Sequence, residues 1–260
     1  MSFRSTFMIR SIPLLIFFTM IKTSAILSQV SVKDSAISSS FIYFTYAYQF
    51  PGGDVTRLFG SNSTIGGGFM FKTKSNWIIG VEGNYLFGGT VKNQDSILKN
   101  ISTPDGFVID ANGYYADIFF SERGYTLYAK VGKLFPVLSP NPNSGITIYA
   151  GAGYYSSKIR IHNPENTAPQ VYGDYKKGYD RLNSGFALSA SAGYQYMSNT
   201  RILNAYLGFE FSQTWTSFRR DRNFDTGLKD NSKFSSQYYG IKFKWLIPLY
   251  KRTPREYYFY

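Results

Sequence analysis

The sequence predicts an all-β protein, an eight-stranded antiparallel transmembrane β-barrel of the outer-membrane type, and two observations support this prediction. The first is an alternation of apolar and polar residues, with a period of two, that recurs along the chain. The second is a strict alternation of short and long connections, which is typical of outer-membrane barrels. The composition agrees, because 19% of the residues are aromatic and a mean hydropathy of −0.21 argues against a bundle of membrane helices.

The first 28 residues have the three-part layout of a secretory signal peptide. Two arginines without an acidic residue precede the apolar run SIPLLIFFTMI, and small residues follow it. The run is shorter than the roughly 20 residues that a membrane-spanning helix needs. We expect cleavage after Ala25 or Ser28 and export of the mature chain, and an uncleaved anchor is the alternative. The expected organisation is a signal peptide (1–28), a periplasmic N-terminal segment (29–40), a transmembrane barrel (41–250) and a periplasmic tail (251–260).

Each predicted strand alternates an apolar string with a polar one. In WIIGVEGNYLF (77–87), apolar and aromatic residues alternate with a string that contains Glu82 and Asn84. The other strands are predicted at 41–50, 63–72, 125–135, 145–155, 186–196, 203–213 and 238–247.

The connections distinguish a barrel from a soluble sandwich. Short connections fall at 73–76, 136–144 and 198–201, and long ones at 51–62, 88–113, 158–184 and 215–234. Loops beyond about 12–15 residues are uncommon in a compact soluble domain. The order of short and long connections therefore predicts a barrel with both ends of the chain in the periplasm.

One segment departs from this regularity. YADIFF (115–120) alternates on the opposite parity from 125–135. We interpret 114–135 as one strand with a bulge near Gly124, because a single inserted residue switches the parity. An extra hairpin above the membrane is the alternative.

The polar string must face the barrel interior, because lipid offers no hydrogen bonds. An eight-stranded barrel is just wide enough for its side chains to fill it, and isolated charges there would be costly. We therefore expect a network that pairs Glu82 and Glu210 with Lys130 and Lys242, acting as a structural plug, with a narrow ion path as the alternative. Other residues expected to point inward are Asn84, Lys244 and Asp117.

Aromatic residues gather at the strand ends, as in the two interfacial girdles of membrane barrels. Trp77 and Trp245 are expected at the periplasmic girdle, and Trp215 at the external one, together with Tyr48 and Phe87.

The residues indicate no enzyme chemistry. His162 is the single histidine and lies in a predicted loop, where Asp174, Asp180 or Ser156 would have to partner it in an acyltransferase or protease. No catalytic, cofactor or metal site is expected, and the chain has no cysteine.

Basic clusters lie in two predicted external loops, at Lys176–Lys177 and at Arg219–Arg220–Arg222. They are either solvated or attract anionic lipopolysaccharide headgroups or an acidic partner. Outer-membrane lipid, lipopolysaccharide and the barrel-insertion machinery are the expected partners, and nucleic acid is not.

Several short segments resemble small outer-membrane barrels of Bacteroidota. They are AYQFPGGD (47–54), FKTKSNW (71–77), NPNSG (141–145), GDYKKGYDRLNSG (173–185) and LYKRTPREYYFY (249–260). The general resemblance is to OmpA/OmpX-like architecture over residues 41–250. More narrowly, the chain resembles the PorG family, the small barrels of the type IX secretion system.

That narrower resemblance implies a structural anchor that links a periplasmic ring lipoprotein to the outer membrane, without catalytic residues. A free-standing surface barrel that binds lipopolysaccharide or host molecules is the alternative function. The aromatic tail 251–260 is either a sorting signal for barrel insertion or a periplasmic docking strip.

Overall fold

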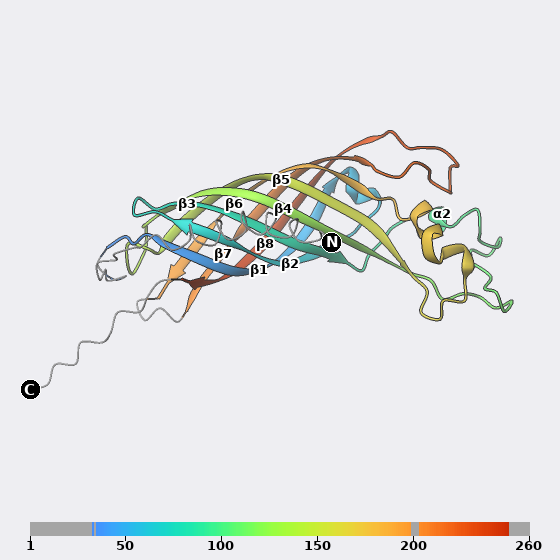
Figure 1. Cartoon of the computed structure of the whole chain (residues 1–260), viewed down its shortest axis with the longest axis horizontal. Helices are drawn as coiled ribbons and strands as arrows, with labels where there is room; N and C mark the ends of the chain where they lie inside the picture. The colour runs from blue at the N-terminus through green and yellow to red at the C-terminus, as the bar shows by residue number, and fades with distance from the viewer. Residues whose placement is uncertain (1–32, 34, 199–202, 250–260) are drawn as a thin grey trace, which may run out of the picture. The chain divides into compact units, whose positions relative to one another are not determined.

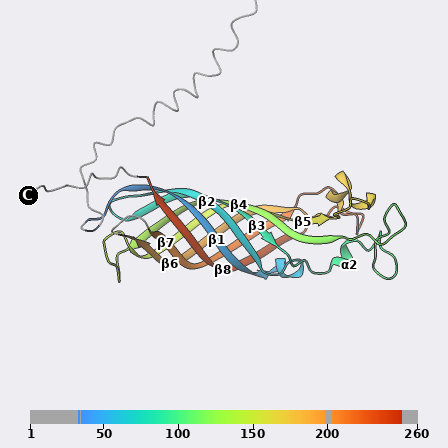
Figure 2. The same cartoon turned by 90° about the horizontal axis from the view of Figure 1, so that it is seen from below.

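The computed structural model describes residues 33, 35–198 and 203–249, so the signal peptide and the tail 251–260 lie outside the described residues. Eight strands form one closed antiparallel barrel in sequence order, and β8 pairs with β1 (Figures 1 and 2). The strands are β1 (Ser39–Gly53), β2 (Asn62–Lys72), β3 (Trp77–Gly88), β4 (Phe119–Phe135), β5 (Gly145–His162), β6 (Asn183–Met197), β7 (Asn204–Phe218) and β8 (Lys233–Pro248). The predicted fold class is confirmed.

Short helices occur in the connections. They are η2 (Asp54–Arg57), α2 (Gln94–Ile97), η3 (Pro169–Val171) and η4 (Gly173–Gly178). In the described part of the chain, no helix has the length and apolar character needed to cross a membrane.

The barrel wall has its apolar side outward. On β3, Ile79 is 60% exposed and Val81 is 53% exposed, whereas the side chain of Glu82, which directly follows Val81, is completely buried. A soluble protein would have the opposite arrangement. An apolar exterior and a polar, filled interior are the arrangement of a small transmembrane barrel, whose closure leaves no unpaired strand edge in lipid.

The bulge predicted near Gly124 is wrong. The ladder between β4 and β5 runs without a break from Phe119↔His162 to Phe135↔Ile146, and Gly124 pairs with Leu86 on β3 in an equally regular ladder. Asp117, expected to point inward, is exposed in the loop before β4. The alternative of an extra hairpin fits this region better, because an isolated bridge joins Ile109 to Tyr115.

The switch of polarity that led to the bulge prediction has another cause. Toward the long loops, the inward residues of β4 and β5 become apolar, as at Phe120, Ile159 and Ile161, while outward residues such as Arg123 and Lys158 are charged. The strand geometry is unchanged, so the environment on the two sides must have changed. We place the edge of the lipid at this reversal.

The inward apolar residues belong to a hydrophobic core that the long loops complete. We call this unit the cap, and it consists of 54–61, 89–118, 163–182 and 219–232, at the end of the barrel where α2 lies (Figure 1). Its buried residues include Val55, Phe59, Val91, Ile97, Leu98, Val108, Ala168, Val171 and Tyr179. The predicted external loops are therefore packed against one another and against the barrel rim.

Candidate functional site

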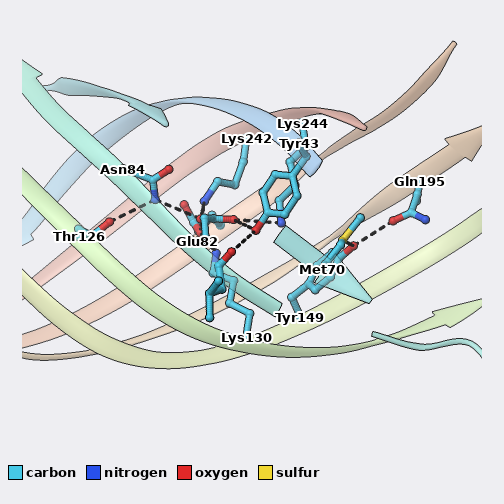
Figure 3. A network of polar contacts seen from close by, with 12 residues as sticks. Tyr43, Met70, Glu82, Asn84, Thr126, Lys130, Tyr149, Gln195, Lys242 and Lys244 are labelled. Carbon is cyan, nitrogen blue, oxygen red and sulfur yellow. Dashed lines mark hydrogen bonds and ion pairs between the residues drawn. The ribbon is translucent and has the colours of Figure 1, made fainter. Parts of the chain in front are cut away.

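The most concentrated set of charges lies in the barrel lumen, on inward positions of β3, β4, β7 and β8 (Figure 3). Oε1 of Glu82 accepts hydrogen bonds from Nζ of Lys130 at 2.8 Å and of Lys242 at 2.6 Å. Oε1 of Glu210 accepts from the same two lysines, at 3.1 and 2.6 Å. The structure thus brings together the four residues that the sequence indicated, and all four are buried. We call them, with Lys244, the lumen cluster.

Lys244 is the member that the predicted network left out. Its Nζ lies 3.2 Å from Oε2 of Glu82, and it is fully enclosed. The signal was available in the sequence, because Lys244 follows Lys242 by two residues and therefore faces the same side of the strand.

The lumen cluster contains three lysines and two glutamates, so it holds one cation more than its carboxylates balance. Tyrosine rings surround the additional cation: Nζ of Lys244 lies 4.2 Å from the ring centroid of Tyr149, 4.9 Å from that of Tyr43 and 5.4 Å from that of Tyr206. Ring faces attract cations in desolvated sites. The tyrosines therefore compensate in part for the missing anion.

Between the lumen cluster and the cap, side chains fill the lumen and leave voids no larger than a single water molecule. Two voids of about 10 Å³ each lie there, and Tyr155 and Tyr238, whose hydroxyls are hydrogen-bonded to each other, line both. A void of that size has room for about one water molecule. This packing favours the structural plug over the ion path.

The end of the barrel with the short turns is closed by a separate set of polar contacts. Oδ1 of Asn143, in the turn between β4 and β5, accepts hydrogen bonds from the backbone N–H of Ile37 and from Nζ of Lys72, both at 2.9 Å. Nδ2 of Asn143 donates to the carbonyl of Ser35 at 2.9 Å. The chain before β1 is thereby tied to a turn more than a hundred residues away.

Ion pairs connect the loops of the cap. Asp180 pairs with Arg220, and Arg181 pairs with Asp225. Nδ2 of Asn100 donates to the carbonyls of Phe224 and Asp225, each at 2.9 Å. The hydrogen bonds that the guanidinium of Arg220 donates to the carboxylate of Asp180 raise the pKa of Arg220. These contacts join three of the four long loops into one unit.

The loop arginines expected to form a basic cluster diverge. Arg219 donates to Ser184, Arg220 pairs with Asp180, and Nε of Arg222 donates to the carbonyl of Gly227 at 2.8 Å. In the other predicted cluster, Nζ of Lys177 lies 2.6 Å from Asp174. The pKa of Asp174 is lowered by its hydrogen bond with Lys177.

The structure separates His162 from Ser156, one of the partners considered from the sequence. His162 is exposed at the end of β5, and Ser156 lies six residues earlier on the same strand, about 20 Å away at the usual rise per residue. Asp180 is engaged with Arg220. Over the ranges that the structure describes, no three His, Cys, Asp or Glu side chains gather as metal ligands would.

The three tryptophans face outward. Trp77 begins β3 and Trp245 lies near the end of β8, both at the end with the short turns, and Trp215 lies toward the cap on β7. All three are about half exposed. Nζ of Lys133 lies 4.9 Å from the Trp77 ring centroid. These places correspond to two girdles at opposite ends of the apolar wall.

No family model matches the chain, and no curated protein does. Solved structures with a distant likeness include Ail, the attachment invasion locus protein of Yersinia pestis, in complex with the heparin analogue sucrose octasulfate, at 10% identity and a TM-score of 0.44. They also include Neisserial surface protein A, at 12% identity and a TM-score of 0.40. Each likeness covers 80% of this chain and 98% of the other. The closed strand order and the apolar outer wall indicate a transmembrane barrel.

Proposed function

We propose that this protein is a non-enzymatic, free-standing surface barrel of the outer membrane with OmpA/OmpX-like architecture, and that it anchors the cap outside the cell to bind lipopolysaccharide or host molecules. The observation that supports this proposal is the closed lumen. Transport through the barrel would require a path past the lumen cluster, where Glu82 and Glu210 are each held by Lys130 and Lys242. A filled barrel is a rigid anchor, and the cap is then the part available to ligands.

Conductance tests this proposal against the ion path. The purified full-length protein, inserted into a planar lipid bilayer, should give no steady single-channel conductance. The variant Glu82→Ala serves as a positive comparison, because it removes the carboxylate that holds three lysines in the lumen. A reproducible open state of the unaltered protein would contradict the sealed anchor.

A second candidate is the anchor role in the type IX secretion system that the PorG resemblance implies, with a periplasmic ring lipoprotein as partner. Its support is the ordered closure at the end with the short turns, where Asn143 ties Ser35 and Ile37 to the barrel. An ordered periplasmic surface of this kind could present a docking site.

Copurification after mild detergent extraction distinguishes the two candidates. Deletion of 251–260 tests the tail, which lies outside the described residues. Loss of a ring lipoprotein with the barrel still inserted supports the anchor role. A barrel that copurifies without such a partner, with or without the tail, favours the free-standing surface protein.

A further inference from the structure

A recess of about 700 Å³ opens on the outside of the barrel wall, near the cap. Small residues at outward positions form its floor: Ser156 of β5 is the register partner of Ser184 of β6. At the next outward position toward the barrel centre, the partners are Tyr154 and Phe186. On β5 and β6 the wall therefore changes at this height from large aromatic side chains to serines, and this change creates the space.

Four cations border the recess, and no carboxylate lines it. They are Arg123, Lys158, Arg160 and Arg219. Arg123 and Lys158 lie directly opposite each other in the β4–β5 ladder, an arrangement that is destabilising for like charges. None of the ion pairs formed by the described residues includes any of these four cations. An anion from outside the chain would relieve this repulsion.

Two of the cations are already held in place at the recess. Nη1 of Arg123 donates to the carbonyl of Glu122 at 2.7 Å, and Arg219 is bonded to Ser184. Nε of Arg219 donates to Oγ of Ser184 at 2.8 Å, and Nη2 donates to the carbonyl of Ser184 at 3.2 Å. An ordered side chain loses less conformational entropy when a ligand binds. Guanidinium groups also match the geometry of phosphate oxygens. Arg219 is therefore fixed at the recess, and the guanidinium N–H groups that Ser184 does not use are left for a phosphoryl group.

The position of the recess relative to the membrane indicates which kind of anion it would bind. Three tyrosines line it: Tyr154 lies one outward position nearer the barrel centre than Ser156, Tyr125 is the register partner of Ser156, and Tyr85 is that of Tyr125. The ring centroids of Tyr125 and Tyr154 are 6.0 Å apart. Tyrosines of a barrel girdle lie at the level of lipid headgroups. The lipid-facing residue Leu127 is the register partner of Tyr154 and continues the apolar wall. A soluble anion would contact only the cations and not the tyrosines. A phosphorylated lipid would contact the cations with its headgroup and the tyrosines with its acyl chains.

We propose that the recess binds a phosphorylated lipid of the outer leaflet, with its phosphate at Arg123, Lys158, Arg160 and Arg219 and its acyl chains along the tyrosines. This site rests on the outer-membrane orientation of the proposed function and gives the lipopolysaccharide binding named there a location on the barrel wall, below the cap.

The test uses the full-length protein in dodecyl maltoside micelles, with bisphosphorylated lipid A as the probe. Lipid retention is measured by native mass spectrometry, and the midpoint of thermal unfolding is followed in parallel. The double variant Arg123→Gln/Lys158→Gln should bind the lipid at least about 10-fold more weakly, because charge-assisted hydrogen bonds are lost. The matched control, Lys74→Gln/Lys133→Gln, removes the same charge at the opposite end and should bind as the unaltered protein does.

Three further arms identify the ligand source. Dephosphorylated lipid A should be retained poorly, since the cations then have no partner. Inorganic phosphate that binds as tightly as the lipid would overturn the lipid assignment, and so would heparin that binds through these residues while lipid A is not retained. Equal retention of lipid A by the double variant and its control would overturn the site itself.

The single variant Lys158→Gln provides a second test if the double variant does not fold, because Lys158 is exposed on the wall. It should weaken lipid retention in the same direction, and unchanged retention would count against the site. Failure of this site would leave the conductance result of the proposed function unaffected. The two proposals therefore fail in distinguishable ways.

Discussion

The lumen of the barrel differs in chemistry from the cap and the strand ends that support the cap. In the lumen, the enclosed residues are charged, as at Glu82 and Lys242, and the wall outside them is apolar. In the cap and the strand ends beside it, the enclosed residues are apolar, as at Phe59 of the cap and Ile161 of β5, and charged side chains such as Lys158 face outward. Both are packed interiors. The difference shows that the surrounding solvent, lipid in one case and water in the other, decides which string of an alternating strand is apolar.

The largest effect is expected in the lumen, where removing one charge leaves others uncompensated. Glu82→Gln leaves Lys130, Lys242 and Lys244 without their common carboxylate. Breaking a buried ion pair on one side destabilises a protein by about 3–5 kcal/mol. Urea unfolding in lipid vesicles, followed by the shift of the heat-modifiable band on a gel, measures the loss.

The control for this variant is Asp95→Asn, which neutralises an exposed carboxylate of the cap. It should change stability by less than about 0.5 kcal/mol. An equally small effect of Glu82→Gln would show that the lumen cluster does not stabilise the barrel.

In the cap, the variant Phe59→Ala should lower stability by creating a cavity, and not by removing a charge. Phe59 is 1% exposed in the cap core, and Phe→Ala at such a site costs about 3–5 kcal/mol. The loss should be confined to the cap. Hydrogen exchange should increase over 89–118 and 163–182, while the barrel strands stay protected. Faster exchange throughout the barrel would mean that the two regions unfold as one unit.

The third comparison uses two outward positions of β4. Ala129→Lys places a cation against the middle of the apolar wall, whereas Ser121→Lys places one beyond the polarity reversal. The first should destabilise the barrel by about 2–4 kcal/mol, and the second by about 0–1 kcal/mol. Unfolding in lipid vesicles gives both values. Similar values for the two variants would contradict the position of the lipid edge.

The smallest effect concerns pH in the cap. The backbone N–H groups of Tyr114 and Asn112 donate to Asp110, and the bond from Tyr114 is the main reason that the pKa of Asp110 lies below its ordinary value of 3.8. A lowered pKa means that the stabilisation of this turn is present above the ordinary value and is lost as the pH falls through the lowered one. An NMR titration of the Tyr114 amide should show the change only in acid. A change near neutral pH would exclude Asp110 as its origin.

The sequence predicts the direction of a side chain where the lipid requires apolar and polar residues to alternate strictly along a strand. The inward direction of Glu82, Lys130, Glu210 and Lys242 followed from the apolar residues beside them, and the structure places all four in the lumen. The cap core could not be found in this way. Phe59, Ile97 and Val171 lie in irregular loops without a period, and their contacts depend on how four separate loops fold together.

The incorrect prediction of a bulge near Gly124 also arose from the surroundings of the strand, which the sequence does not state. The switch of apolar parity between 115–120 and 125–135 suggests a change in backbone geometry, whereas the ladder from Phe119 onward is regular and the surroundings change. The same reversal occurs on β5, from the outward Ile148 to the inward Ile159. A polarity switch shared by two paired strands therefore indicates a membrane edge better than it indicates a bulge.

Cysteine labelling along β4 tests the central claim most directly, because the chain has no native cysteine. Single variants at outward positions, Ser121→Cys and Arg123→Cys above the reversal and Ala129→Cys and Val131→Cys below it, are exposed to a membrane-impermeant maleimide on intact cells. The first two should react rapidly, and the last two should react only after the membrane is dissolved and the barrel unfolded. Rapid labelling of Ala129→Cys on intact cells would contradict a lipid-facing wall.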